Sequence, residues 1–312
     1  MKVSSLSQEQ LRQSLSGAGL NFRIGGFVFR IRSSLAAVID GLALLYADYP
    51  LAPHNEFADF HVEVRRPHGP RRWFRPQVLF FFDGRPWFKP LPLKHALAML
   101  EWGLNWCVYG HVNQYLIIHG AVVEKDGYAA IFPGGPGVGK STLCAGLVAR
   151  GWRLLSDELV LVSTADGRIA PLPRPVSLKN DSIELIERFY PDAVIGPRIA
   201  ATEKGTIAHL RPPADSVARA EEYAQPGWVI FPAYESGAAT QLTTQPKGLG
   251  FMRAARGTFN YHVLGLAGFQ ALANLIDTCR CFKLIYSDLD DAVAHIARLE
   301  PPSVATRKAS AP

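Results

Sequence analysis

The chain has 312 residues, of which 48% are hydrophobic and 19% are charged, so it can bury a full core and is not a mainly disordered protein. Its longest apolar stretches, residues 35–46 and 96–110, contain Asp40 and Glu101 and are shorter than the ~20 residues of a membrane helix, which argues against a membrane protein. Residues 1–100 carry 13 Lys and Arg against 7 Asp and Glu, so the net charge of +6 lies in this part of the chain.

The first thirty residues contain no apolar signal region, so we expect a cytoplasmic protein. The four cysteines are too sparse for a disulfide framework and lack the paired spacing of a zinc site. Cys279 and Cys281 form a lone Cys-x-Cys pair, which we interpret as core thiols rather than as a metal or redox site.

The first 90 residues predict a mostly antiparallel α+β region. Ser7 and Gln10 have the spacing of a capping box at a helix start. Residues 21–33 alternate like one strand, and residues 35–46 have a helical pattern. Asp83-Gly84 is a hairpin signal between further strand-like runs.

An arginine cluster lies between two of these strand-like runs. It comprises Arg65, Arg66, Arg71, Arg72 and Arg75 around a Pro-His-Gly-Pro turn. Such a cluster can dock an acidic partner or nucleic acid, but it can equally be the solvated tip of a β-hairpin. Because the chain has no recognisable nucleic-acid motif, we favour an acidic protein or peptide over nucleic acid as the partner, if the cluster docks one.

Residues 91–110 are apolar on nearly every face, which predicts a buried helix with Trp102 and Trp106 in the core. From residue 114 the pattern changes to two strands, a glycine-rich loop, a helix and a third strand. We expect this third strand, residues 152–156, to lie beside the strand that precedes the loop. Helix, strand and helix follow in the C-terminal part, and the tail from residue 301 is expected to be disordered.

Residues 134–141, GGPGVGKS, match the phosphate-loop (Walker A) pattern Gly-x-x-x-x-Gly-Lys-Ser/Thr in full. Glycines allow consecutive N–H groups to face phosphate oxygens, and the helix that follows presents its positive end to the anion. In such loops the lysine reaches the β- and γ-phosphates and the serine hydroxyl binds Mg²⁺. The expected nucleotide-binding residues are Gly134, Gly135, Pro136, Gly137, Val138, Gly139, Lys140, Ser141 and Thr142.

Asp157 and Glu158 follow the strand after the loop helix, and we expect them to reach the same edge of the sheet as the loop. One carboxylate would then take a proton from an incoming hydroxyl while the other holds Mg²⁺. The alternative is a solvated turn between strands. His119 ends an apolar strand, where a single histidine is more often a core residue than a functional one.

Together, His119-Gly120, the loop GGPGVGKST and the segment GWRLLSDELV resemble the catalytic core of the bacterial HPr kinase/phosphorylases. The resemblance covers about residues 114–165. It implies a phosphoenolpyruvate-carboxykinase-like phosphate-loop fold, ATP with Mg²⁺, and phosphorylation of a serine on a protein or peptide. It also implies that Asp157 is the base, that His119 is its neighbour, and that Glu158 stands at a second acidic position, as a metal ligand beside Ser141.

The chain lacks the Glu-x-Arg-Gly-Leu-Gly stretch that follows the core in HPr kinases, so we expect an acceptor other than HPr. Phosphoryl transfer needs a cation from outside the loop, because charge spreads over the equatorial oxygens. Lys204 and Arg211 are the candidates, and the alternative for both is ordinary surface charge.

These observations predict an α/β protein with a phosphate-loop kinase core of the HPr kinase and phosphoenolpyruvate carboxykinase type. An α+β region at residues 1–112 would precede the core at 113–300. The predicted activity is ATP-dependent phosphorylation of a serine hydroxyl on a small protein or peptide. A small-molecule kinase and a non-catalytic nucleotide-binding module are the alternatives. We expect self-association, and neither nucleic acid nor a membrane as partner.

Overall fold

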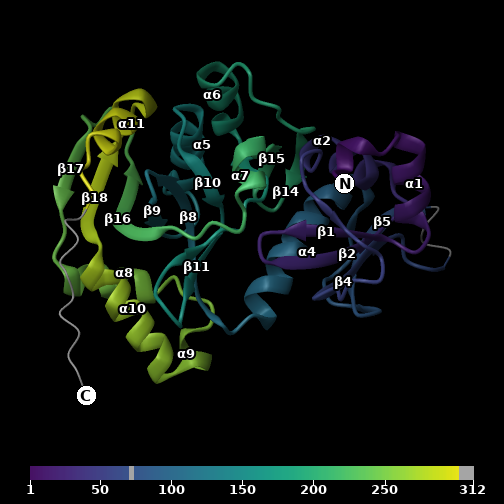
Figure 1. Ribbon diagram of the computed structural model, residues 1–312. Coiled ribbons are helices and arrows are strands. Elements are labelled where there is room, and N and C mark those ends of the chain that lie inside the picture. Colours follow the sequence, from purple (N-terminus) through teal and green to yellow (C-terminus); the bar gives the residue numbers. More distant parts are fainter. Residues whose placement is uncertain (70–73, 302–312) are drawn as a thin grey trace.

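A computed structural model describes residues 1–69 and 74–301 of the chain (Figure 1). It shows a mixed α/β protein with several sheets. Two parts of the sequence-based predictions lie outside the described residues: Arg71 and Arg72 of the arginine cluster, and residues 302–312 of the expected tail.

The N-terminal sheet has the strand order β3-β1-β2-β4-β5-β6, and β7 pairs with β5. Residues 21–33, predicted as one strand, form the hairpin β1/β2 instead, because Gly25 adopts a φ of 60° that permits a tight turn. The predicted hairpin β4/β5 and the turn at Asp83-Gly84 are confirmed. The strands are β1 (Leu20–Ile24), β2 (Phe27–Arg32), β3 (Leu51–Ala52), β4 (Phe60–Arg65), β5 (Gln77–Phe82), β6 (Arg85–Pro86) and β7 (Leu91–Pro92).

Helices pack on this sheet and bury its apolar side chains. The capping box predicted from Ser7 and Gln10 is present at the start of α1. The predicted long helix begins later than expected, at Ala96, and its Trp102 and Trp106 are half-buried rather than core residues. The helices are η1 (Val3–Ser5), α1 (Gln8–Ser16), α2 (Ala36–Leu45), η2 (Leu93–His95) and α4 (Ala96–His111).

The central sheet has the strand order β12-β11-β8-β9-β16-β18-β17, and β10 pairs with β8. β9 runs parallel to β16, and β16 runs parallel to β18. Most of these strands are apolar along their length, as expected for a sheet covered on both faces, whereas the edge strand β17 is mainly exposed. They are β8 (Tyr115–Lys125), β9 (Tyr128–Pro133), β10 (Arg153–Ser156), β11 (Leu159–Ser163), β12 (Ile169–Ala170), β16 (Gln225–Tyr234), β17 (Gln241–Thr244) and β18 (Arg280–Tyr286).

The strand after the loop helix lies beside β8, not beside β9 as predicted. β8 is long enough to pair with two strands in succession: Glu124 lies opposite Arg153 of β10, and His119 lies opposite Leu159 of β11. Because β10 and β11 both run antiparallel to β8, the two residues that join them, Asp157 and Glu158, lie at the middle of β8.

Helices cover both faces of the central sheet (Figure 1). One face packs against α5 and α11, and the other packs against α8 and α10. Figure 1 shows α5, α6 and α11 above the sheet and α8, α9 and α10 below it. The helices are α5 (Lys140–Ala149), α6 (Asp181–Phe189), α8 (Lys247–Ala255), α9 (Tyr261–Leu264), α10 (Leu266–Thr278) and α11 (Leu289–Ala297).

A small third sheet has the order β13-β15-β14 and lies between the two larger ones in Figure 1. It consists of β13 (Val176–Lys179), β14 (Ile199–Thr202) and β15 (Gly205–Leu210), and α7 (Ala214–Ala218) follows it. The core of the N-terminal sheet continues into the central sheet through Ile117 and Leu161, so the two parts share one apolar cluster.

A buried ion pair also joins the two parts. Arg174 donates to Glu101 of α4 over 2.5 Å, and Tyr46, which directly follows α2, donates to the other oxygen of the same carboxylate over 2.8 Å. Both charged side chains are only 3% exposed. Each of these buried charges would be unpaired without the other. The ion pair therefore holds α4 in place against the segment before β13.

Candidate functional site

The glycine-rich loop lies where the sequence places it, between the buried strand β9 and helix α5. Gly134, Gly137 and Gly139 have φ values of 155°, 84° and 92°, which residues with a Cβ rarely adopt. A Cβ added at Gly135 or Gly137 would meet no atom within 4 Å. The loop therefore has open space beside Gly135 and Gly137, directly before the N-terminus of α5.

Lys140 is the first residue of α5 and is only 8% exposed. Its Nζ donates a 2.7 Å hydrogen bond to the carbonyl oxygen of Gly135, so the ammonium lies across the loop. Burial lowers the pKa of Lys140, and the carboxylates of Asp157 and Glu158 oppose that shift. The loop thus holds one partly buried positive charge near two acidic side chains.

The close packing of Gly139 explains why a residue without a Cβ is required there. The hydroxyl of Tyr286, at the end of β18, donates a 3.1 Å hydrogen bond to the Gly139 carbonyl. A Cβ on Gly139 would lie 2.2 Å from that hydroxyl. Tyr234 of β16 packs edge-to-face on Tyr286 with ring centroids 5.8 Å apart. Sequence reasoning missed both tyrosines, since neither belongs to a local motif.

Asp157 connects this loop to the strands behind it. Its Oδ1 accepts a 3.0 Å hydrogen bond from the Ser141 hydroxyl, and its Oδ2 accepts a 3.0 Å hydrogen bond from the backbone N–H of Ser177. The residue is 4% exposed. Burial and the nearby Glu158 carboxylate raise the pKa of Asp157 to about 6, although both hydrogen bonds oppose the shift. The structure therefore brings Asp157, rather than Glu158, to the hydroxyl of Ser141.

Glu158 faces a different set of groups. Its Oε2 lies 3.6 Å from Nδ1 of His119, and its Oε1 lies 3.8 Å from Nζ of Lys179. Burial opposes ionisation, but the positive charges of Lys179 and Lys204 outweigh it and lower the pKa of Glu158. Its φ of 85° is strained for a residue with a side chain, as is common where function dictates the backbone.

His119 is not a core residue, because its side chain is 23% exposed and borders Glu158. Burial and the charge of Lys140 lower the pKa of His119 against the opposing effect of Glu158, which favours the neutral imidazole. The glycine that follows it has a packing reason: a Cβ on Gly120 would lie 2.8 Å from the carbonyl oxygen of Phe132 in β9. In this pair, His119 offers an accessible ring, and Gly120 allows β8 and β9 to approach each other closely.

The two predicted cations lie in different places. Lys204 follows β14 at the tip of a hairpin, and its charge lowers the pKa of Glu158, so it belongs to the electrostatic surroundings of the site. Arg211 instead forms an ion pair with Asp48 of the N-terminal part. The structure therefore does not bring Arg211 to the loop. Thr142 lies in the first turn of α5 and is half-buried.

The arginine cluster is described only in part. Arg65 ends β4, stacks on the ring of Phe81 at 4.0 Å, and lies 2.8 Å from Nε2 of His68. This half-buried arginine is held by its neighbours within the hairpin. With Arg71 and Arg72 outside the described residues, docking at this cluster stays a prediction.

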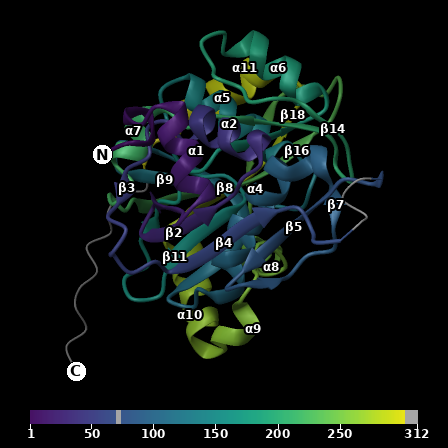
Figure 2. The same ribbon diagram turned by 90° about the vertical axis from the view of Figure 1, so that its right-hand side faces the viewer.

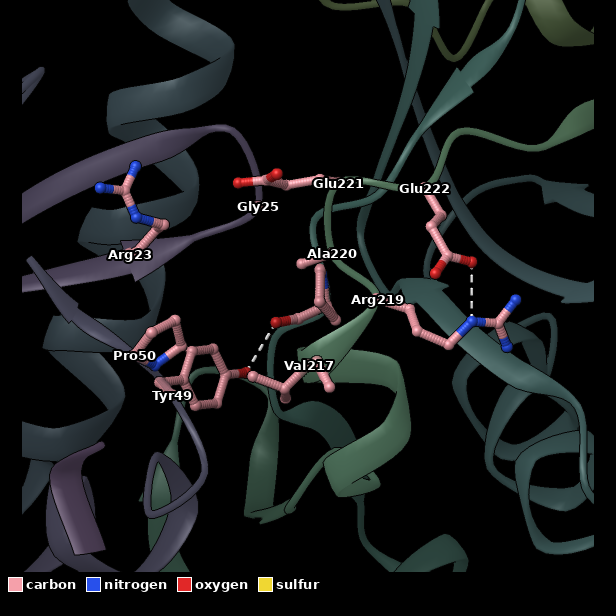
Figure 3. Close-up of a pocket in the computed structure, with 11 residues that line it drawn as sticks. Arg23, Gly25, Tyr49, Pro50, Val217, Arg219, Ala220, Glu221 and Glu222 are labelled. Atoms are coloured by element: carbon pink, nitrogen blue, oxygen red, sulfur yellow. Dashed lines mark hydrogen bonds and ion pairs between the residues drawn. The ribbon is translucent and has the colours of Figure 1, made fainter. Parts of the chain in front are cut away.

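A cavity of about 270 Å³ lies away from the loop, between the N-terminal sheet and the segment after α7 (Figure 3). Three of its four charged side chains form ion pairs. Arg23 pairs with Glu56, and Arg219 pairs with Glu222 over 2.7 Å, as Figure 3 shows for the second pair. None of the predicted site residues lines this cavity, so it is not the site built around the loop.

Three further observations concern residues 1–69 and 74–301. Among them there is no cluster of three or more His, Cys, Asp or Glu side chains able to hold a metal ion by themselves. In the same ranges no helix has the length and apolar character needed to cross a membrane. All four cysteines are buried and free, which confirms the interpretation of Cys279 and Cys281 as core thiols.

No protein-family model matches the chain, and a search of the curated proteins found no similar sequence. Among solved structures, the chain is similar to the Hpr(Ser) kinase/phosphatase from Coxiella burnetii, with 13% sequence identity and a TM-score of 0.26. The match covers 58% of this chain and 95% of that chain. A TM-score this low supports no conclusion about fold or activity.

Proposed function

We propose that this protein is an ATP-dependent kinase that transfers the γ-phosphoryl group to a hydroxyl, expected to be serine, of a protein or peptide. One observation carries the proposal: the hydrogen bond between Ser141 and Asp157 joins a complete phosphate-loop motif to a pair of adjacent carboxylates. A loop that only bound an anion would not need two acidic side chains at its edge.

The loop supplies the binding site for the nucleotide phosphates. Its N–H groups and the positive end of α5 would face the phosphate oxygens, and Lys140 would exchange its contact with the Gly135 carbonyl for the β- and γ-phosphates. The low exposure of Lys140 strengthens this attraction, because a buried charge is screened less than a solvated one.

The oxygen atoms beside the loop suit Mg²⁺, which prefers hard oxygen ligands and binds through one or two carboxylates plus substrate phosphates. The Ser141 hydroxyl and the Asp157 carboxylate are in contact, so these two residues would hold the ion. When bound, Mg²⁺ would supply positive charge to the β- and γ-phosphates. Glu158, the metal ligand predicted from the sequence, is not assigned this role, because its side chain faces His119 and Lys179.

The acceptor hydroxyl must lose its proton while its oxygen bonds to the γ-phosphorus. At the same time the bond from that phosphorus to the β–γ bridging oxygen breaks and ADP leaves. We assign the proton to His119, with Glu158 stabilising the imidazolium that forms, because this pair is accessible and the lowered pKa of His119 favours a neutral ring that can accept a proton. Asp157, the base expected from the sequence, is 4% exposed and both its oxygens already accept hydrogen bonds.

Incubation with γ-labelled ATP and fractionated host lysate tests the proposed activity. We expect one small protein or peptide to become labelled on serine by the parent, and no labelling by the Lys140→Ala protein. ADP formation should depend on the same lysate fraction. If the parent binds ATP but neither labels any species nor forms ADP with any fraction, the chain is a nucleotide-binding module and the proposal fails.

A further inference from the structure

Helix α4 carries a row of half-buried aromatic side chains at the edge of the N-terminal core. Trp102, Trp106 and Tyr109 occupy positions i, i+4 and i+7, so they lie on one face of the helix. The opposite face is fully buried in the N-terminal core. The three aromatic rings pack against the edge of that core, where Trp106 lies 5.5 Å from Phe82 between ring centroids, but each is only half-buried, so this is the partly open face of the helix.

Both ends of this row reach residues of the proposed active site. Nζ of Lys204 lies 5.4 Å from the ring centroid of Trp102. Tyr109 stacks on Phe259 with ring centroids 4.4 Å apart, and Phe259 packs edge-to-face on His119 at 5.8 Å. The open face of α4 therefore borders the place where the acceptor hydroxyl would be activated.

The row continues outward onto an exposed segment of the N-terminal part. Trp87, which is 52% exposed, lies 4.8 Å from Trp106 between ring centroids. Residues 84–94 around it contain Arg85, Lys89 and Lys94, all exposed, and no acidic residue. This segment therefore adds three solvated cations to the outer end of the aromatic row.

The hairpin that carries Lys204 is fixed to the same side of the molecule. Nε2 of His95, in η2 just before α4, lies 3.0 Å from the carbonyl oxygen of Ala200 in β14. Figure 2 shows β7 and β14 on the same side, at the right of the view. We call the combined set the basic aromatic surface: Arg85, Trp87, Lys89, Lys94, Trp102, Trp106 and Lys204.

We propose that the basic aromatic surface docks an acidic segment of the peptide or protein whose hydroxyl is phosphorylated. The proposal rests on the proposed function, because the docked molecule is the acceptor of that reaction. Carboxylates of the segment would face Arg85, Lys89 and Lys94, while its apolar side chains would cover Trp87 and Trp106. The acceptor hydroxyl would then extend past Trp102 toward His119.

The positive charge of the basic aromatic surface favours an acidic partner. The positive excess of the chain lies within residues 1–100, and this surface presents cations beside the exposed ring of Trp87 and the half-buried rings of Trp102 and Trp106. A basic or neutral peptide would gain only the apolar contacts, whereas an acidic one gains steering and paired charges as well. Single-stranded nucleic acid is the competing ligand for basic aromatic surfaces, so the test includes it.

The test measures binding without ATP, so that it does not depend on catalysis. An array of 15-residue peptides, each with a central serine and randomised flanks, is probed with the full chain. We expect Asp and Glu to be enriched among the bound peptides. For the best binder, replacing each acidic residue by Gln should weaken binding at least about 10-fold near 50 mM salt, and less at high salt. The oligonucleotide dT15 should bind more weakly than the acidic peptide.

Matched variants locate the surface. Trp87→Ala with Lys89→Gln removes one exposed ring and one exposed cation, and should reduce the acidic preference to about 2-fold or less. The control, Phe269→Ala with Arg12→Gln, removes an exposed ring on α10 and an exposed cation on α1, and should behave like the parent. No enrichment of acidic peptides, tighter binding of dT15, or equal behaviour of the two double variants would overturn the proposal.

ATP binding, titrated separately on the same proteins, keeps the two proposals apart. A parent protein that binds ATP normally but shows no preference for acidic peptides overturns the docking surface and leaves the kinase proposal standing. An acidic preference that depends on Trp87 and Lys89, in a chain that binds no ATP, supports the docking surface and contradicts the kinase.

Discussion

The hydroxyl of Ser141 donates a 3.0 Å hydrogen bond to Oδ1 of Asp157, across 16 positions of sequence. Ser141 belongs to the loop helix, and Asp157 belongs to the junction of β10 and β11. This contact brings an expected metal ligand of the loop motif together with one of two carboxylates. The other carboxylate, Glu158, turns to His119, so the two acidic residues have separate surroundings.

The separation predicts different kinetic effects for two isosteric substitutions. Asp157→Asn should raise the Mg²⁺ concentration for half-maximal activity at least about 10-fold, because a neutral amide is a weaker ligand for a hard cation. Glu158→Gln should lower kcat about 10²-fold with little change in the Mg²⁺ requirement, because it removes the charge that stabilises protonated His119. The reverse pattern would show that Asp157, rather than His119, takes the proton of the acceptor hydroxyl.

The raised pKa of Asp157 predicts a pH-dependent stability of the nucleotide-free protein. Because the pKa is about 6 in the folded chain and near 4 when unfolded, the folded state binds the proton more tightly and is destabilised as pH rises through this window. The free energy of unfolding should fall by about 1 kcal/mol from this residue between pH 5 and pH 8.

Urea unfolding at the two pH values measures this effect, and Asp157→Asn supplies the comparison. The neighbouring charges of Glu158 and Lys179 remain in both proteins. The Asn variant should show a smaller loss than the parent between pH 5 and pH 8. Identical losses would mean that Asp157 ionises at its ordinary pKa in the folded protein.

Gly139 is predicted to be intolerant of even one methyl group. In Gly139→Ala the new Cβ would lie 2.2 Å from the Tyr286 hydroxyl, and alanine would have to adopt a φ of 92°. We expect ATP affinity to fall at least about 10-fold as the loop shifts. Gly135→Ala is the matched control, since a Cβ there meets no atom within 4 Å, and it should cost less. Equal losses would show that loop shape does not govern binding.

The buried ion pair predicts a large stability effect far from the loop. Glu101→Ala leaves the guanidinium of Arg174 buried without its counter-charge and should lower the free energy of unfolding by about 3 to 5 kcal/mol. Replacing both charges, as in Glu101→Leu with Arg174→Met, should recover much of that loss. Denaturant unfolding provides the measurement, and a double variant no more stable than Glu101→Ala would contradict this account of the pair.

Local patterns allowed much of this structure to be predicted. The capping box at Ser7, the turn at Asp83-Gly84 and the free buried cysteines follow from short-range residue chemistry, and all three are present. The loop also lies between a strand and a helix, as its glycines and Lys140 indicate. Each of these features depends on residues only a few positions apart.

Features that depend on distant pairing could not be predicted. β10 pairs with β8 because β8 is long enough for two partners, which no local pattern in residues 152–156 reveals. The contact of Tyr286 with Gly139 spans 147 positions. The sequence around Trp102 predicts a core residue, but the side chain is only half-buried. Its position beside Lys204 depends on where the distant β14/β15 hairpin lies.

Calorimetric titration of ATP with Mg²⁺ tests the central claim most directly, since every proposed role depends on the loop binding nucleotide phosphates. The parent should bind ATP, and Lys140→Ala should lose at least about 10-fold in affinity, because no backbone amide replaces the charge of the ammonium. Lys125→Ala, which removes an exposed lysine at the end of β8, should bind like the parent. Equal affinity of the parent and a folded Lys140→Ala protein would contradict the assignment of the loop.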